Sequence, residues 1–233
     1  MARGQRWMAQ GTEIFFDALA TLPDDRLEGP TRLAGWSGKH LLAHLAANAD
    51  ALVNLAYWAR TGEERPMYAS REQRDADIEA GAKSPASELR AWAVRSAATL
   101  EERLGELDER QWSREVRTAQ GRTVAATEIP WMRAREVMVH AVDLDAGVEF
   151  GDLPDGFLAA LIDDITAKRS AAAERALTLT ATDHDGTWTI PGSGEPAQVT
   201  GALADLAAYL SGRRPHGVTG ADGGPAPELP RWL

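Results

Sequence analysis

Four long segments with helical periodicity fill the first two thirds of this chain, and they constrain its fold more than any other feature. Apolar residues recur at intervals of three and four over about residues 5–22, 38–60, 86–107 and 130–146. Ser37 is a preferred N-cap residue for the second segment. Residues 114–126 alternate loosely around Gln120-Gly121, which predicts a small hairpin. Four amphipathic helices bury their apolar sides most simply against one another, so we predict a helical bundle.

The chain changes character after about residue 147. Gly151 and Pro154 are typical of a point where one helix ends and another begins, and the new helix is expected to run to about Arg175. Short alternating stretches then predict strands over residues 177–182, 187–190 and 198–200. A last helix is expected over residues 202–210, and a Gly/Pro-rich tail follows over residues 217–233. The fold class we predict is α+β, with a helical bundle over residues 1–149 and a small α+β domain over residues 150–233.

The composition narrows the classes of partner. The sequence has 35 Asp and Glu against 25 Lys and Arg, a net charge of -10, and no block of basic residues. This balance disfavours binding to nucleic acid or to anionic membranes. The most apolar stretch, residues 41–58, is interrupted by polar side chains, and no apolar signal segment begins the chain. We therefore expect a cytoplasmic monomer that acts on small molecules.

Glu136 and His140 are the strongest candidates for chemistry. Their spacing of four residues places a carboxylate and an imidazole on one side of the fourth predicted helix. A third metal ligand is available from His40 or His44 in the second predicted helix, and spacing alone does not choose between them. The chain has no cysteine, so a metal site here uses nitrogen and oxygen only, which suits zinc with an open coordination position.

The same side of the fourth helix also has a plainer interpretation. Four polar residues share it: Arg133, Glu136, His140 and Asp143. They can form a solvated stripe joined by an Arg133–Glu136 ion pair, a common surface arrangement. Against this, two predicted helices hold three of the five histidines, whereas His184 and His216 lie in predicted turns and are assigned no role. Asp143 or Asn48 is available to orient a ligating imidazole, and the pattern assigns this part to neither.

Arg213 and Arg214 follow the last predicted helix directly. Cations are favoured near the C-terminus of a helix, which by itself explains such a pair. The functional interpretation is that an acidic protein needs a local cation to bind a small anion, and arginine binds a carboxylate through two hydrogen bonds.

Two motifs, Gly35-Trp-Ser-Gly-Lys-His-Leu-Leu-Ala-His and Arg135-Glu-Val-Met-Val-His-Ala-Val-Asp-Leu, closely resemble the mycothiol-dependent maleylpyruvate isomerases. The resemblance extends through the stretches that begin at Thr61 and Thr118 to the closing Pro-Arg-Trp-Leu, and so covers nearly the whole chain. It implies an N-terminal DinB-like four-helix bundle that carries a divalent metal, usually zinc, and a smaller α/β C-terminal domain.

Carried over by motif, the resemblance assigns the metal ligands to His44, Glu136 and His140. The substrate-contacting arginine of the family falls on Arg213, which we take as the catalytic residue. The family often has a single arginine beside glycine at this turn, whereas this chain has Arg213-Arg214-Pro215, so Arg214 is an alternative.

The resemblance also implies an activity. The family converts maleylpyruvate to fumarylpyruvate, a step in the gentisate pathway of aromatic catabolism, with mycothiol as the thiol cofactor. A thiol bound to zinc loses its proton, and the resulting thiolate adds to the cis double bond, allows rotation and then leaves. Three alternatives remain at this stage: a mycothiol S-transferase acting on another electrophile, a zinc hydrolase, and a non-enzymatic metal-binding module. The hydrolase is disfavoured because Leu45, and not a glutamate, follows His44.

Overall fold

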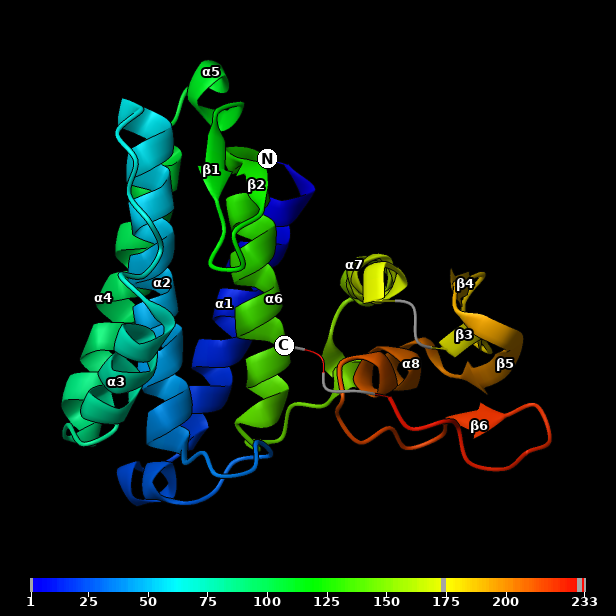
Figure 1. The fold of residues 1–233 in the computed structure, drawn as a ribbon. Helices are drawn as coiled ribbons and strands as arrows, with labels where there is room; N and C mark the ends of the chain where they lie inside the picture. Colours follow the sequence, from blue (N-terminus) through cyan, green and yellow to red (C-terminus); the bar gives the residue numbers. More distant parts are fainter. Residues whose placement is uncertain (1, 173–174, 230–231, 233) are drawn as a thin grey trace. The chain divides into compact units, whose positions relative to one another are not determined.

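The computed structural model describes residues 2–172, 175–229 and 232. The chain divides into two compact units, Met1–Val148 and Glu149–Leu233, shown together in Figure 1. The fold is α+β, as predicted, with long helices in the first unit and a small sheet with two helices in the second. No helix among the described residues is both long enough and apolar enough to cross a membrane.

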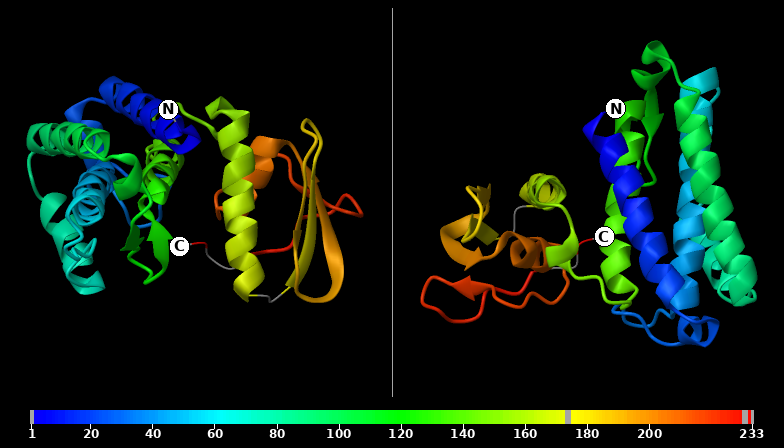
Figure 2. Two further views of the ribbon diagram at one scale, coloured as in Figure 1. Left: turned by 90° about the horizontal axis from the view of Figure 1, so that it is seen from above. Right: turned by 180° about the vertical axis from the view of Figure 1, so that it is seen from behind.

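The first unit is built on four long helices, which confirms the predicted bundle. They are α1 (Arg3–Thr21), α2 (Gly38–Thr61), α4 (Ala86–Gly105) and α6 (Ile129–Asp143). Helix α1 packs along α6 and α2 packs along α4, while α2 also contacts α6 across the bundle (Figures 1 and 2). The contact between α2 and α6 matters most for function, because these two helices carry the candidate ligands.

Local sequence explains where the long helices begin and end. The Ser37 hydroxyl accepts a hydrogen bond from the backbone N–H of His40 and so caps α2. The helix ends at Gly62, which has a φ of 83° in the left-handed region that favours glycine. Helix α6 has Pro130 in its first turn, where the missing N–H of proline has no cost.

Shorter elements connect the long helices. They are η1 (Asp24–Glu28), α3 (Arg71–Gly81), α5 (Glu109–Trp112), β1 (Glu115–Arg117), β2 (Thr123–Ala125) and η2 (Ala126–Glu128). Strands β1 and β2 pair antiparallel around Gly121, which confirms the predicted hairpin. Helix α3 was not predicted, because Ile78 is its one buried side chain among the described residues and the rest is polar. Its Gly81 lies close against Ala43, so α3 is fixed on α2.

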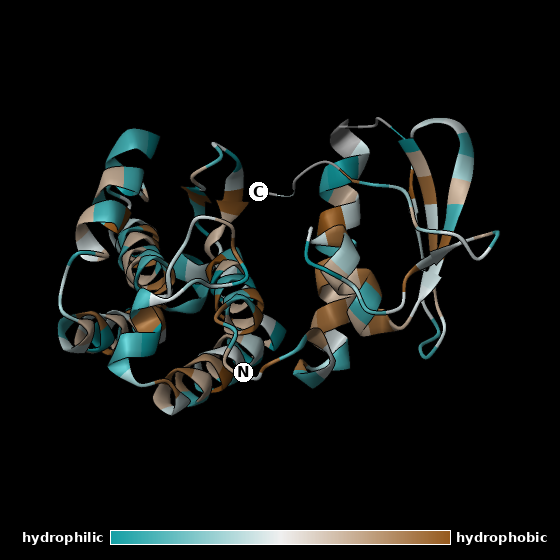
Figure 3. Cartoon of the chain, turned by 90° about the horizontal axis from the view of Figure 1, so that it is seen from below, coloured by the Kyte–Doolittle hydropathy of each residue, from teal (hydrophilic) through white to brown (hydrophobic). Residues whose placement is uncertain are grey.

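The core of the first unit lies between the four helices. Phe15, Leu41 and Val137 are among the buried side chains of one cluster that joins α1, α2 and α6. Figure 3, which views the bundle roughly along the helix axes, shows hydrophobic and hydrophilic residues side by side on its long helices. Helices α1 and α6 approach closely at Gly11, where a Cβ atom would lie 2.6 Å from Cγ of Met138.

The second unit contains one four-stranded sheet with two helices. Its elements are η3 (Phe150–Asp152), α7 (Asp155–Ala172), β3 (Arg175–Ala181), β4 (Thr187–Ile190), β5 (Ser193–Gly201), α8 (Leu203–Leu210) and β6 (Thr219–Gly220). The strand order is β4-β3-β5-β6, with β3 parallel to β5 and the other pairs antiparallel. Helices α7 and α8 pack together on one face of the sheet (Figure 2).

Two predicted boundaries in this unit differ from the structure. Arg175, expected at the end of a helix, begins β3 and pairs with Ser193; residues 173–174 lie outside the described residues. The strand expected at 198–200 is longer, because β5 runs beside β3 from Ser193 to Gly201. Both differences have the same cause: β3 and β5 supply hydrogen-bonding partners to each other, and this pairing extends each strand beyond its own alternating pattern.

Candidate metal centre

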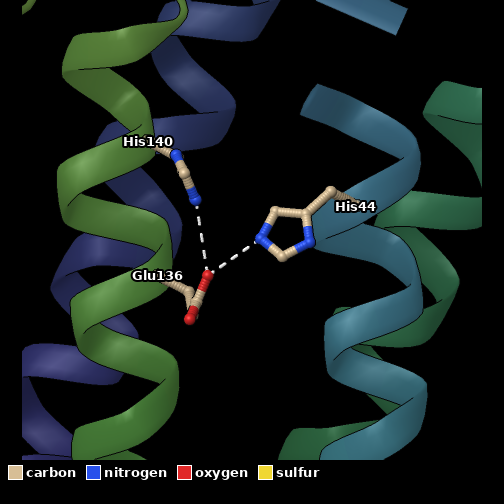
Figure 4. Close-up of side chains that lie close together, drawn as sticks. All are labelled: His44, Glu136 and His140. Carbon is tan, nitrogen blue, oxygen red and sulfur yellow. Dashed lines mark hydrogen bonds and ion pairs between the residues drawn. The ribbon is translucent and has the colours of Figure 1, made fainter. Parts of the chain in front are cut away.

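Three side chains from α2 and α6 converge between the two helices, as Figure 4 shows. Oε2 of Glu136 lies 2.9 Å from Nε2 of His44 and 3.4 Å from Nε2 of His140. One potential ligand atom of each residue lies within 4.8 Å of the other two. The two imidazole rings are 5.0 Å apart and nearly perpendicular, with an angle of 89° between their planes. All three side chains therefore direct ligand atoms at one small volume.

The structure separates the two histidines of α2 that spacing alone left equivalent. His40 stays at the start of the helix, where its Nδ1 lies 2.7 Å from the Ser37 hydroxyl and its Nε2 lies 3.7 Å from a carboxylate oxygen of Glu79. His44, one turn further on, is buried and faces α6. Tertiary structure thus brings His44, and not His40, to Glu136 and His140.

The interpretation of the α6 polar side as a solvated stripe is wrong. Arg133 is 2% exposed and Asp143 is fully buried. The Arg133 guanidinium donates hydrogen bonds to the backbone carbonyl of Leu45, at 2.8 Å, and to the side-chain oxygen of Asn48, at 3.0 Å. The polar side of α6 therefore faces α2 within the bundle, where its charged groups have hydrogen-bonding partners in the protein.

The two imidazoles have different partners on their outer nitrogens. Nδ1 of His140 lies 2.8 Å from the buried carboxylate of Asp143, which can only accept a hydrogen bond. Asp143 thus orients this imidazole, a part that the sequence pattern had left unassigned. Nδ1 of His44 lies 3.3 Å from Nη2 of Arg74, which can only donate. Both rings therefore direct Nε2 at the centre of the cluster, whereas Nδ1 faces a hydrogen-bond acceptor in His140 and a hydrogen-bond donor in His44.

Burial and close charges shift the pKa values of the three groups. Burial would raise the pKa of Glu136, but hydrogen bonds from His140 and His44 hold it well below its ordinary value, so this carboxylate is ionised. Burial lowers the pKa of His44 despite the nearby Glu136. Burial also acts to lower the pKa of His140, but Asp143 and Glu136 together raise it. Glu136 is therefore the fixed negative charge of the cluster.

Three neighbours of the cluster were not found by sequence reasoning. Arg74 comes from the unpredicted helix α3, and its guanidinium lies 5.9 Å from the ring of Tyr68. Burial, together with the charge of Glu136, raises the pKa of the Tyr68 phenol. Trp36 packs edge-on against His44, with ring centroids 5.4 Å apart. Ser70, which caps α3, was the one local indication in the sequence that a helix begins there.

Arg213 belongs to the second unit, where its turn follows α8. One guanidinium nitrogen donates to the carbonyl of Ser211 at 2.7 Å, and the side chain is half-buried, whereas Arg214 is exposed. The turn therefore holds Arg213 in a defined position, and Arg214 faces solvent. His184 stacks on Trp188 and His216 is exposed, in keeping with surface positions.

The donor set of the cluster fits a zinc ion. Two imidazole nitrogens and one carboxylate oxygen are the ligands of many catalytic zinc sites, which keep a fourth position for water or substrate. Asp143 adds the outer hydrogen bond that such histidine ligands usually make. Both imidazoles face the same carboxylate oxygen of Glu136, and a cation between the three side chains would be a common partner for all of them.

Comparisons with known proteins point to one family. The family model described as the mycothiol maleylpyruvate isomerase N-terminal domain matches residues 8–145. A crystal structure of the mycothiol-dependent maleylpyruvate isomerase is 40% identical, with a TM-score of 0.95, and the match covers 98% of this chain and 95% of that one. A crystal structure of a histidine-to-alanine mutant of that isomerase is 39% identical, with a TM-score of 0.94 and the same coverage. No curated protein gives a significant match.

Proposed function

This chain belongs to the mycothiol maleylpyruvate isomerase family, and from that premise we propose that it catalyses the mycothiol-dependent cis-trans isomerisation of maleylpyruvate to fumarylpyruvate. The observation that supports this most is the convergence of His44, Glu136 and His140 in a bundle whose match to the isomerase extends over nearly its full length. Action in the cytoplasm as a monomer remains a prediction from the sequence.

We assign Zn²⁺ to His44, Glu136 and His140. When bound there, the metal lowers the pKa of a coordinated thiol, so that the sulfur is a thiolate at neutral pH. The chain contains no cysteine, so the sulfur has to come from a small-molecule thiol, which we take to be mycothiol. Among the protein groups, Glu136 supplies the negative ligand and Asp143 holds the His140 ring with Nε2 directed at the centre.

The reaction we propose needs no net change in atoms or electrons. The thiol adds across the cis double bond, rotation follows about the resulting single bond, and loss of the thiol restores the double bond in the trans arrangement. The carbonyl conjugated with the double bond takes up the negative charge during addition, and a nearby cation stabilises that charge. We assign Arg213 to hold a carboxylate of the substrate, an assignment that rests on the resemblance.

Metal analysis combined with an assay of maleylpyruvate isomerisation, with and without mycothiol, tests the proposal. We expect about one zinc per chain, isomerisation that requires mycothiol, and a product with the same mass as the substrate. Isomerisation at the same rate without a thiol would exclude this mechanism. A product heavier by one mycothiol would instead show that the protein is an S-transferase, which shares the thiolate chemistry but does not release the sulfur.

A further inference from the structure

The partners of Nδ1 distinguish the two histidines of the metal centre. For His140, the partner is the carboxylate of Asp143, so Nδ1 carries a proton whether the ring is neutral or charged. Nε2 faces Glu136 over 3.4 Å and is the nitrogen that would bind a metal, once it gives up the proton that it shares with that carboxylate. This arrangement suits a metal ligand, because its outer hydrogen bond is the one that metal-bound histidines usually make.

His44 has the opposite arrangement. Arginine has five N–H donors and no acceptor, so the Arg74 nitrogen 3.3 Å from Nδ1 requires a lone pair on that atom. A neutral imidazole carries one proton, which must then lie on Nε2, where it is donated to Glu136 over 2.9 Å. The nitrogen that faces the centre is therefore protonated, and in this form His44 is not a ligand.

We propose that Arg74 and a divalent metal ion use His44 as mutually exclusive partners, and that metal binding frees the Arg74 guanidinium for a carboxylate of the anionic substrate. When Nε2 is given to the metal, the ring proton has to lie on Nδ1, and this N–H would point at an N–H of Arg74. Two donors repel each other, so the guanidinium has to leave. The inference deepens the proposed function and rests on it for the identity of the substrate.

The surroundings of Arg74 allow such a movement. Its side chain is 28% exposed, and it already pairs with the exposed Asp75 carboxylate at 2.7 Å and lies near the face of the Tyr68 ring. Its helix α3 is held on α2 through Ile78 and Gly81, so the movement that we propose is one of the Arg74 side chain and not of the helix. Arg133, by contrast, is fixed by two hydrogen bonds inside the bundle and cannot serve a ligand in the same way.

Zinc affinity measured by competition with a chromogenic chelator tests the exclusion without thiol or substrate. The Arg74→Gln variant offers an amide oxygen that accepts from Nδ1–H, so it should bind Zn²⁺ roughly 3- to 10-fold more tightly than the wild type. Arg74→Lys keeps a donor-only cation and should show no gain. Asp143→Asn weakens the acceptor at the other histidine and should bind roughly 10- to 100-fold more weakly. Equal or weaker zinc binding by Arg74→Gln would overturn the proposal.

Three further measurements complete the test. Titration with Co²⁺, followed by visible absorption, reports on ligand geometry. The Arg74→Met variant, which lacks any donor, should also bind Zn²⁺ more tightly than the wild type, and it replaces Arg74→Gln if that variant is poorly folded. For the loaded enzyme, Arg74→Gln should raise KM for maleylpyruvate about 10-fold or more, because a charged hydrogen bond is lost while zinc is retained. An unchanged KM would overturn the substrate part. Absence of isomerisation in the wild type would count against the proposed function alone, because the zinc titrations stand without it.

Discussion

The two units of this protein differ in the bonds that some of their buried polar side chains make. In the helical unit, Arg133 and His44 bond to partners on other helices, 85 and 92 residues away in the chain. In the second unit, the hydroxyls of Thr166 and Ser211 bond to backbone carbonyls of their own helices, three or four residues away. Local bonds of the second kind satisfy a polar group wherever a helix is buried. A buried pair such as His44–Glu136 adds little stability over apolar packing, which agrees with the use of these side chains as metal ligands that we propose.

The largest expected effect is the loss of zinc affinity when a candidate ligand of the first unit is removed. His44→Ala, Glu136→Ala and His140→Ala should each reduce zinc affinity by more than roughly 100-fold, beyond the effect of an outer hydrogen bond, because a direct ligand is lost. His216→Ala, which changes an exposed histidine of the second unit, is the matched control and should bind zinc normally. Chelator competition on the purified variants provides the measurement. Full zinc content in all three ligand variants would remove the difference between the units.

The next effect tests whether the second unit contributes to turnover. Arg213→Ala should lower kcat/KM for maleylpyruvate on the order of 100-fold, the loss expected when a charged hydrogen bond of about 2–3 kcal/mol is removed. Zinc affinity should not change, because Arg213 is not among the three candidate ligands. The neighbouring exposed residue supplies the control, and Arg214→Ala should retain near-normal kinetics. If Arg214→Ala were the damaging change, the assignment would move by one residue.

A smaller effect concerns how α6 is held in the bundle. Gly11→Ala places a Cβ atom 2.6 Å from Cγ of Met138 and 2.8 Å from Cγ2 of Val137, so it should destabilise the protein by about 1–3 kcal/mol through overpacking. Gly105 ends α4 and has no atom within 4 Å of a Cβ at that position, so Gly105→Ala should be neutral or slightly stabilising. Urea unfolding followed by circular dichroism compares them. Equal stability of the two variants would show that α1 and α6 are not packed this closely.

The smallest effect is the part of the pH dependence of stability that Tyr209 of the second unit contributes. Burial raises the pKa of Tyr209 from 10.0 to about 12. Between these pH values the unfolded chain loses this proton and the folded chain keeps it, so the free energy of unfolding falls as the pH rises from 10 toward 12. Tyr209→Phe removes the titrating group and should flatten that part of the profile, with no change in zinc affinity. Identical pH profiles of unfolding for the two proteins would refute the shift.

Local sequence determined much of this protein. The periodicity of the long segments predicted the bundle, the caps Ser37 and Gly62 delimit α2, and the spacing of Glu136 and His140 placed two candidate ligands on one side of α6. These features depend on contacts within a few residues, where the geometry of a helix is fixed in advance. Helix α3 was missed for the same reason: its mostly polar sequence gives little periodicity, and packing on α2 holds it in place.

Only the tertiary structure decided which sides of the helices meet. From residue spacing alone, His40 and His44 are equivalent and the polar side of α6 can equally well face water. The way in which α2 packs against α6 then buries Arg133 and Asp143, joins His44 to Glu136, and leaves His40 at the helix start. It also brings Arg74 to His44 from a helix that periodicity did not reveal. Helical spacing fixes directions within one helix, whereas the partner that each direction meets depends on contacts between residues far apart in the chain.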